Sequence, residues 1–330
     1  MRICLSSLKI FEILNKKILD LAIPNIISNI SIPLLGIVDM ALMGHLESDA
    51  YIGAIALGSL IFNFIYWSLG FLRMGTSGFT AQAWGRKDLP ETILVFSRAA
   101  FIGIVMSFVL LVLQRPIESL SFLVLKGETR VEELAMAYFR IRIWAAPAAL
   151  GQFALLGFFL GMQNAKLPMV VLVSTNAINI ACSYLFVMQL GMESNGVALG
   201  TVIAQYSGLL IALFFFRKYF RRLFRYWSWQ ATVRWKKLRH FLMINRDIFI
   251  RTMCLVVVFS IFTARSASVD LQNAGDETIL AVNSILMQFF MFFSFLIDGF
   301  AHASEALTGK FIGAGDRNSL IRSIRLLFIW

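Results

Sequence analysis

Long uninterrupted apolar blocks constrain this chain more than any other feature. Several of them run for about 20 residues, the length that an α-helix needs to cross a hydrocarbon core of about 30 Å. Hydrophobic residues make up 58% of the 330 residues and charged residues only 15%, whereas ordinary soluble domains are about 45–50% apolar. The remaining polar surface is too small to cover a water-soluble globule. The sequence therefore predicts an all-α polytopic membrane protein embedded in a lipid bilayer.

Eight membrane-spanning helices and the start of a ninth are expected from these blocks. Their approximate ranges are 18–43, 51–83, 91–113, 134–162, 166–190, 196–217, 246–264 and 277–311, with the ninth beginning near 319. The seventh range is the least regular, because Arg246, Asp247 and Arg251 crowd its start. The first block is too long for the hydrophobic region of a signal peptide and has no clear cleavage site, so we expect it to remain in the mature protein.

The basic residues are distributed in the way that membrane topology requires. The chain has a net charge of +11, and nine of its basic residues lie in the stretch 217–239. Segments rich in basic residues are the N-terminus, 86–87, 166, 217–239 and 310–317, and they alternate with poorer segments at 45–49, 115–133, 193 and 270–277. The positive-inside rule places the rich segments and the N-terminus in the cytoplasm. No nucleic-acid-binding motif accompanies the charge, so nucleic acid is not expected as a partner.

The residue types of catalytic and metal sites are scattered along the chain. The three cysteines (Cys4, Cys182, Cys254) and the three histidines (His45, His240, His302) follow no metal, redox or disulfide spacing. No nucleophile–base pair, phosphate-binding loop or cofactor motif is present. The sequence thus predicts neither an enzyme nor a metal or cofactor site. We expect an ion gradient, not ATP, to supply energy for any transport.

Two segments six helices apart resemble each other. Residues 80–88 (TAQAWGRKD) close the second helix, and residues 308–316 (TGKFIGAGD) close the eighth. An offset of about 228 residues and an even number of helices predict parallel halves, related by an axis along the membrane normal. We divide the chain into an N-lobe of six helices (1–217), a basic cytoplasmic connector (218–245) and a partial C-lobe (246–330).

The same offset predicts how much of the second lobe the sequence contains. Residues from Ser319 onward correspond to the start of the third helix, and the apolar stretch that they begin is too short to cross a membrane. Two equal halves would give a protein of roughly 450 residues. We therefore expect the second lobe to be incomplete and the sequence to be a fragment or a truncated product.

The motifs at these positions resemble those of a known family. Residues 21–24 (LAIP) and 39–46 (DMALMGHL) resemble the first helix of the multidrug and toxic compound extrusion (MATE) family. Residues 71–83 (FLRMGTSGFTAQA), 245–248 (NRDI) and 298–306 (DGFAHASEA) resemble its DNA-damage-inducible protein F branch. The resemblance covers essentially the whole chain. It implies a two-lobed bundle of parallel six-helix repeats in the cell's inner (plasma) membrane.

Asp39 is the strongest candidate for ion coupling. It lies in an otherwise apolar stretch near the outer end of the first helix. A carboxylate inside a membrane is costly, so it faces a cavity, finds a partner or is protonated. Removal from water favours the neutral form of a carboxyl group, which brings proton exchange toward physiological pH. The resemblance implies that this acid is the proton-linked site, and the alternative is an interfacial residue that caps the helix or meets Arg73.

Pro24 and Pro33 interrupt the same helix. A proline removes a backbone donor and kinks a helix. The functional interpretation is a hinge whose bend changes as Asp39 gains or loses a proton, which the resemblance favours at Pro24. A static kink that shapes the bundle is the alternative.

Asn176 and Asn179 share a face of the fifth helix, because residues three apart are neighbours on a helix surface. Amides in hydrocarbon are expected to form hydrogen bonds across helices, here around Asp39 or as simple interhelical ties. They match the family's Asn-x-x-Asn pattern. The family commonly has an acid four residues further on, where this chain has Ser183, which weakens any two-carboxylate relay.

Asp298 and Glu305 lie seven residues apart on the eighth helix, roughly on one face. Together they are candidates for binding a cation or a cationic substrate in the second lobe. The alternative for Glu305 is an ion pair with Lys310. Arg73, Arg140 and Arg142 are expected to pair with acids or to extend toward the membrane surface rather than to bind substrate.

These residues predict a secondary active efflux antiporter. It would export small amphipathic or cationic molecules by alternating access, in exchange for protons or, as the other candidate, sodium, and would be monomeric when complete. One alternative is a lipid or lipid-linked precursor flippase of similar architecture, which would favour a basic cavity where Asp39 and Asp298 suggest an acidic one. An inactive, truncated remnant of the antiporter is the other alternative.

Overall fold

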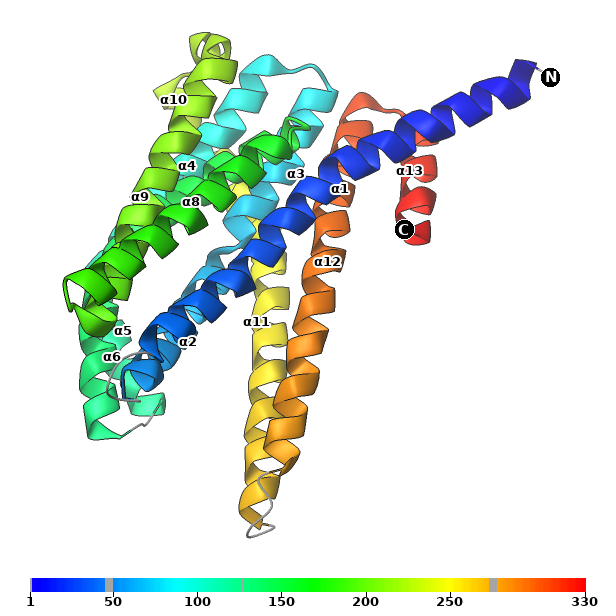
Figure 1. Ribbon diagram of the computed structural model, residues 1–330. Helices are drawn as coiled ribbons and strands as arrows, with labels where there is room; N and C mark the ends of the chain where they lie inside the picture. Colours follow the sequence, from blue (N-terminus) through cyan, green and yellow to red (C-terminus); the bar gives the residue numbers. More distant parts are fainter. Residues whose placement is uncertain (1, 45–49, 126–127, 273–277) are drawn as a thin grey trace.

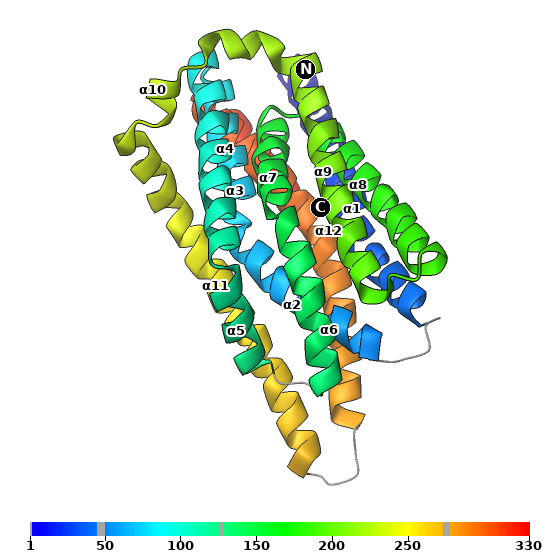
Figure 2. The same ribbon diagram turned by 90° about the vertical axis from the view of Figure 1, so that its left-hand side faces the viewer.

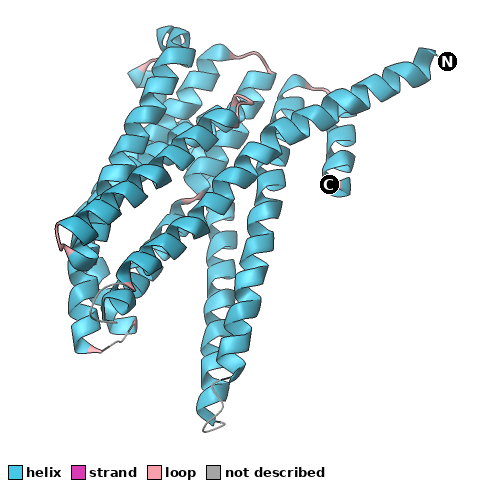
Figure 3. Cartoon of the chain, in the orientation of Figure 1, coloured by secondary structure: helices cyan, strands magenta, loops and turns pink. Residues whose placement is uncertain are grey.

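The computed structural model describes residues 2–44, 50–125, 128–272 and 278–330. In these ranges the chain forms helices and short connections, with no strand (Figures 1 and 3). The helices are α1 (Arg2–Met43), α2 (Ala50–Leu69), α3 (Phe71–Gly85), α4 (Leu89–Val112), α5 (Gln114–Val124), α6 (Thr129–Arg142), α7 (Ala146–Gly161), α8 (Lys166–Tyr184), α9 (Glu193–Phe220), α10 (Trp229–Thr232), α11 (Trp235–Gln272), α12 (Thr278–Ala314) and α13 (Arg317–Ile329). The expected all-α class is confirmed.

Six segments within the described residues are long and apolar enough to cross a membrane. They are Glu12–Asp39, Ala50–Gly85, Leu89–Val112, Thr129–Gly161, Lys166–Gln189 and Glu193–Tyr226. Each overlaps one of the six spans predicted ahead of the basic connector. The seventh and eighth predicted spans lie in α11 and α12, which are 38 and 37 residues long and form a hairpin beside the other helices (Figure 1).

Two of the expected continuous spans are broken in the middle. The second span divides into α2 and α3 at Gly70, just after Ser68, whose hydroxyl donates to the Phe64 carbonyl at 2.6 Å. The fourth divides into α6 and α7 at a short 3-10 turn, Ile143–Ala145. Pro147 then stands in the first turn of α7, where its missing N–H leaves no helix hydrogen bond unmade.

Helical structure also extends beyond several predicted boundaries. The first helix begins at Arg2 instead of near residue 18, and α11 begins at Trp235, inside the segment expected to be a connector. The segment 115–133, expected to be an external loop, contains α5 and the start of α6. The physical reason is that the apolar ranges mark only the part suited to lipid, whereas helical hydrogen bonds continue into polar flanks.

The connections between the helices lie at two opposite ends of the bundle. The turns from α3 to α4, from α7 to α8 and from α12 to α13 lie at the same end as the chain start and the α9–α11 connector (Figures 1 and 2). The ends of α1, α5, α8 and α11 lie at the other end. This division matches the alternation of basic-rich and basic-poor segments along the sequence. The end that holds the connector is called the basic end below.

The internal repeat is visible in the backbone. Asp88 and Asp316 occupy equivalent positions, with φ and ψ of −88° and 83° in one and −88° and 82° in the other. Each carboxylate accepts a hydrogen bond at 3.0 Å from the backbone N–H three residues later. Lys87 and Gly315, one residue earlier, both have a positive φ, of 60° and 70°. The turns that close α3 and α12 are therefore the same motif, separated by six spans.

The two repeat-related helices α3 and α12 also cross each other near the basic end. A Cβ added at Gly85 would collide with the Lys310 carbonyl, and one added at Gly313 would collide with the Gln82 carbonyl. Because Gly85 corresponds to Gly313 and Gln82 to Lys310 in the repeat, the contact is reciprocal. Only glycine allows two backbones to approach this closely.

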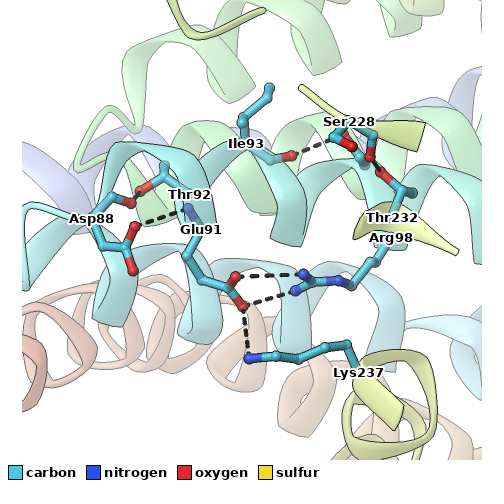
Figure 4. Close-up of polar contacts among 9 residues, drawn as sticks. Asp88, Glu91, Thr92, Ile93, Arg98, Ser228, Thr232 and Lys237 are labelled. Carbon is cyan, nitrogen blue, oxygen red and sulfur yellow. Dashed lines mark hydrogen bonds and ion pairs between the residues drawn. The ribbon is translucent and has the colours of Figure 1, made fainter. Parts of the chain in front are cut away.

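The connector is fastened to α4 by an ion-paired carboxylate. Glu91 lies between the Arg98 guanidinium, at 2.8 Å, and the Lys237 ammonium group, at 3.7 Å (Figure 4). Arg98 is on α4, whereas Lys237 is in the first turn of α11. Glu91 therefore links the end of the connector to the first lobe.

Candidate transport site in the helix bundle

Asp39 lies near the end of α1 that is remote from the basic end. Its side chain is half-buried, and its Oδ1 atom is buried with no hydrogen-bond partner among the described residues. A buried oxygen without a partner is costly, so a proton, an ion or water satisfies such an atom in native proteins. One carboxyl oxygen of Asp39 is therefore left without a hydrogen bond by the described side chains.

Arg142, not Arg73, supplies the positive charge that acts on Asp39. Arg142 itself is held by the Tyr138 hydroxyl and by Ser59, whose Oγ lies 3.1 Å from Nη1. Its guanidinium also stacks over the Phe62 ring at 4.9 Å from the centroid. Arg142 thus lies among aromatic side chains and acts on an acid, the first of the two arrangements expected for it. Arg140 does pair with an acid, because its Nη2 lies 2.7 Å from Glu118.

Pro24 and Pro33 lie within one continuous helix, α1. Near Pro24, polar side chains turn back to the backbone: Ser28 donates to the Pro24 carbonyl at 2.8 Å and Asn25 to the Leu21 carbonyl at 2.7 Å. The same stretch packs on α12, where a Cβ at Gly299 would lie 3.1 Å from the Ala22 carbonyl. The Pro24 region is therefore within the stretch of α1 that contacts α12.

Asn176 and Asn179 each form a hydrogen bond across helices, but in different directions. Asn176 donates to Ser31 of α1 at 2.8 Å, and Asn179 donates to Thr201 of α9 at 3.1 Å. Ser183, at the position where the family commonly has an acid, donates to the Asn179 side chain at 3.1 Å. The pair therefore connects α8 to both neighbours. Among the described residues, the side-chain hydrogen bonds of the two amides are with these hydroxyls and not with Asp39.

Asp298 and Glu305 lie on one face of α12 together with His302. The Glu305 carboxylate is 3.9 Å from the His302 ring, and no ion pair between Glu305 and Lys310 occurs among the described residues. His302 contacts the Arg73 guanidinium of α3 at 2.6 Å. The Arg73 charge also acts on both acids. The second-lobe candidates thus belong to a cluster that reaches across to the first lobe.

Sequence reasoning missed two members of these sites. His302 was expected to be isolated, yet it lies between Asp298 and Glu305, and its spacing of four and three residues from them was a usable signal. Ser31, which accepts the hydrogen bond from Asn176, gave no signal, because serine is common in membrane helices.

An all-helical bundle with six described segments long and apolar enough to span a membrane, and with polar clusters inside its apolar helices, is typical of a polytopic membrane protein. A family model described as MatE matches residues 24–185. The chain belongs to this family, whose members are transporters and not enzymes.

Individual relatives agree with this assignment. DNA damage-inducible protein F of Escherichia coli K12 is 37% identical over 93% of this chain, and multidrug and toxin extrusion protein 1 of Pongo abelii is 24% identical over 93%. The chain spans 66% and 53% of the length of these two proteins, less than two thirds of either. A structure described as the outward-facing conformation of a multidrug resistance MATE family transporter aligns with a TM-score of 0.83 at 20% identity, covering 96% of this chain and 70% of that one.

Proposed function

We propose that the protein is a secondary active efflux antiporter that exports small amphipathic or cationic molecules in exchange for protons. The observation that carries this proposal is the buried Oδ1 of Asp39, which has no hydrogen-bond partner among the described residues and lies inside an apolar helix of a chain from a transporter family. Several relatives are named for multidrug extrusion or export, which supports the class of substrate.

The coupling in this proposal runs along α1. A proton that neutralises Asp39 removes its attraction to Arg142, since only the carboxylate is charged. α1 is then free to change its shape where Pro24 and Pro33 have removed backbone hydrogen bonds. The Pro24 stretch contacts α12, so a change of shape there would alter the packing between the lobes. Asn176 holds α1 to α8 through Ser31 and would have to adjust to such a movement.

Asp298 and Glu305 have a secondary role in this proposal. Asp298 is an exposed residue of α12, and the charges of Arg73 and Arg251 act on its carboxyl group. It would attract a cationic substrate or a coupling cation to the second lobe. Sodium is the competing coupling ion, and the orientation with the basic end in the cytoplasm of an inner-membrane protein belongs to the same proposal.

The test is export of a fluorescent cationic dye from cells that lack other efflux pumps. Expression of the protein should accelerate export under an inward proton gradient, and Asp39→Asn should remove at least nine tenths of that acceleration, since asparagine cannot exchange a proton. Glu133→Gln, at an exposed acid of α6, is the matched control and should export like the wild type. Wild-type export by Asp39→Asn would refute the role of Asp39, and export that follows a sodium gradient alone would refute proton coupling.

A further inference from the structure

The contact between Arg73 and His302 fixes the protonation state of the imidazole. Nη2 of Arg73 lies 2.6 Å from Nε2 of His302, which is hydrogen-bond distance. A guanidinium has donors only and stays protonated in proteins. Nε2 must therefore be the acceptor, with its lone pair directed at Arg73. In this structure His302 is a neutral imidazole.

The other ring nitrogen then carries the proton and faces an acid. Nδ1 of His302 lies 3.9 Å from Oε2 of Glu305, one helical turn further along α12. Glu305 in turn lies against α3, because a Cβ at Gly78 would be 3.6 Å from its Oε1. The neutral ring of His302 thus lies between the guanidinium of Arg73, from the first lobe, and the carboxyl group of Glu305. All three groups lie within the α3–α12 interface.

The site is buried and has few other charged neighbours. His302 is 8% exposed. The charged groups that act on the cluster are Arg73 of α3, Arg251 of α11, and Asp298 and Glu305 of α12 itself. α1 and α13 contribute apolar side chains to the cluster around Ala303, Ala306 and Leu307 of α12, among them Ile18, Leu21 and Leu326. α7 has no charged residue, and the nearby Gln163 donates to the Ala306 carbonyl at 2.7 Å.

We propose that His302 is a second proton-binding site, shared by the two lobes, and that proton binding to Nε2 breaks the contact between α12 and Arg73. An imidazolium has two N–H donors and no lone pair, so it cannot accept from Arg73 and is repelled by its charge. Glu305, on the opposite side of the ring, attracts the new charge. The proton that Nε2 gains is released again when Arg73 returns to the ring.

The consequence concerns the packing of α3 against α12. Arg73 and His302 lie on the same two helices that cross at Gly85 and Gly313, so the polar contact and the glycine crossing hold one interface together. Loss of the Arg73–His302 hydrogen bond would weaken the association of the lobes at the basic end. Because it connects proton binding with lobe separation, this inference rests on the proposed antiport function, but it concerns a site distinct from Asp39.

Nitrogen-15 magnetic resonance of the histidine rings tests the first step. The chain has only three histidines, and a His302→Gln sample identifies the signal of His302 by its disappearance. In lipid nanodiscs at neutral pH, we expect a neutral ring with an unprotonated Nε2 and a protonated Nδ1. Arg73→Met removes the donor and should convert the ring to the Nε2–H form that free histidine prefers. A wild-type ring that is Nε2–H or doubly protonated at neutral pH would overturn the proposal.

Distance measurements between spin labels test the second step. Labels at Lys218→Cys in the last turn of α9 and Ala314→Cys at the end of α12, in a background without native cysteines, report the separation of the lobes at the basic end. We expect a longer-distance population to appear as the pH is lowered. His302→Gln should abolish this shift, because glutamine accepts from Arg73 but does not bind a proton.

Asp39→Asn separates this proposal from the previous one. It should keep the pH-dependent distance shift, since His302 and Arg73 are intact, even if it abolishes export. A shift that persists in His302→Gln, or a wild type with no shift, would refute the role of His302 without bearing on Asp39.

Discussion

Single polar residues inside apolar helices carry much of the specificity of this molecule. Arg98 illustrates this, because its side chain is 5% exposed and its ion-pair partner Glu91 is 23% exposed. Both Arg98 Nη atoms reach the Glu91 carboxylate, at 2.8 and 3.4 Å. Removal of one member of a buried pair is more harmful than removal of both, because it leaves a desolvated charge without compensation.

We predict that Glu91→Gln destabilises the protein by about 2–3 kcal/mol, below the 3–5 kcal/mol of a fully buried pair because Glu91 keeps some contact with solvent. The double variant Glu91→Leu with Arg98→Leu should recover most of the loss, since no buried charge remains. Thermal unfolding in detergent or nanodiscs measures both. A double variant less stable than Glu91→Gln would show that the pair is not the source of the effect.

At the scale of helices, the crossing of α3 and α12 is reciprocal, because equivalent residues of the two repeats contact each other. The helices approach so closely that Gly85 and Gly313 each face a backbone carbonyl of the other helix. A carbonyl is part of the helix backbone and cannot rotate away as a flexible side chain can. The two helices can accept a larger residue only by moving apart.

We therefore predict that Gly85→Ala and Gly313→Ala each destabilise the protein by about 1–3 kcal/mol, the usual cost of overpacking. Gly36→Ala is the matched control, because a Cβ there meets nothing within 4 Å. It should be neutral or stabilising by up to about 1 kcal/mol, since alanine favours a helix over glycine. Thermal unfolding measures the change in stability of the three variants. An equal loss of stability at positions 36 and 85 would contradict the close crossing.

At the scale of the whole molecule, the bundle has two chemically different ends. The basic end carries the connector and the end of α9, where nine basic residues lie between positions 217 and 239 without an acid among them. Trp227, Trp229 and Trp235 are all exposed there. Aromatic and basic side chains together are typical of the cytoplasmic membrane interface.

Thiol labelling from each side of the membrane tests this orientation. Lys87→Cys and Lys166→Cys, in a background without native cysteines, should react with a membrane-impermeant reagent only after the membrane is permeabilised. Arg130→Cys and Gln189→Cys, at the opposite end, should react in intact cells. The reverse pattern would invert the orientation, and mixed labelling of each pair would contradict the two-ended arrangement.

The sequence by itself determined the all-helical membrane class, the first six spans, the parallel repeat and Asp39 as a carboxylate within an apolar helix. These properties depend on local hydropathy and on residues near each other in the chain, which the sequence displays directly. It did not reveal the breaks at Gly70 and at Ile143–Ala145, because both halves of each span are apolar.

Only the tertiary structure decided which polar side chains meet. Arg73 and His302 are 229 residues apart and come together because α3 and α12 cross. Arg142, and not Arg73, became the positive charge near Asp39. The physical reason is that a helix whose own residues are apolar on all sides has no amphipathic stripe, so its sequence does not show which face it turns toward its neighbours. Their mutual rotation and crossing are set by close packing of small residues and by interhelical hydrogen bonds, which exist only once the helices have assembled.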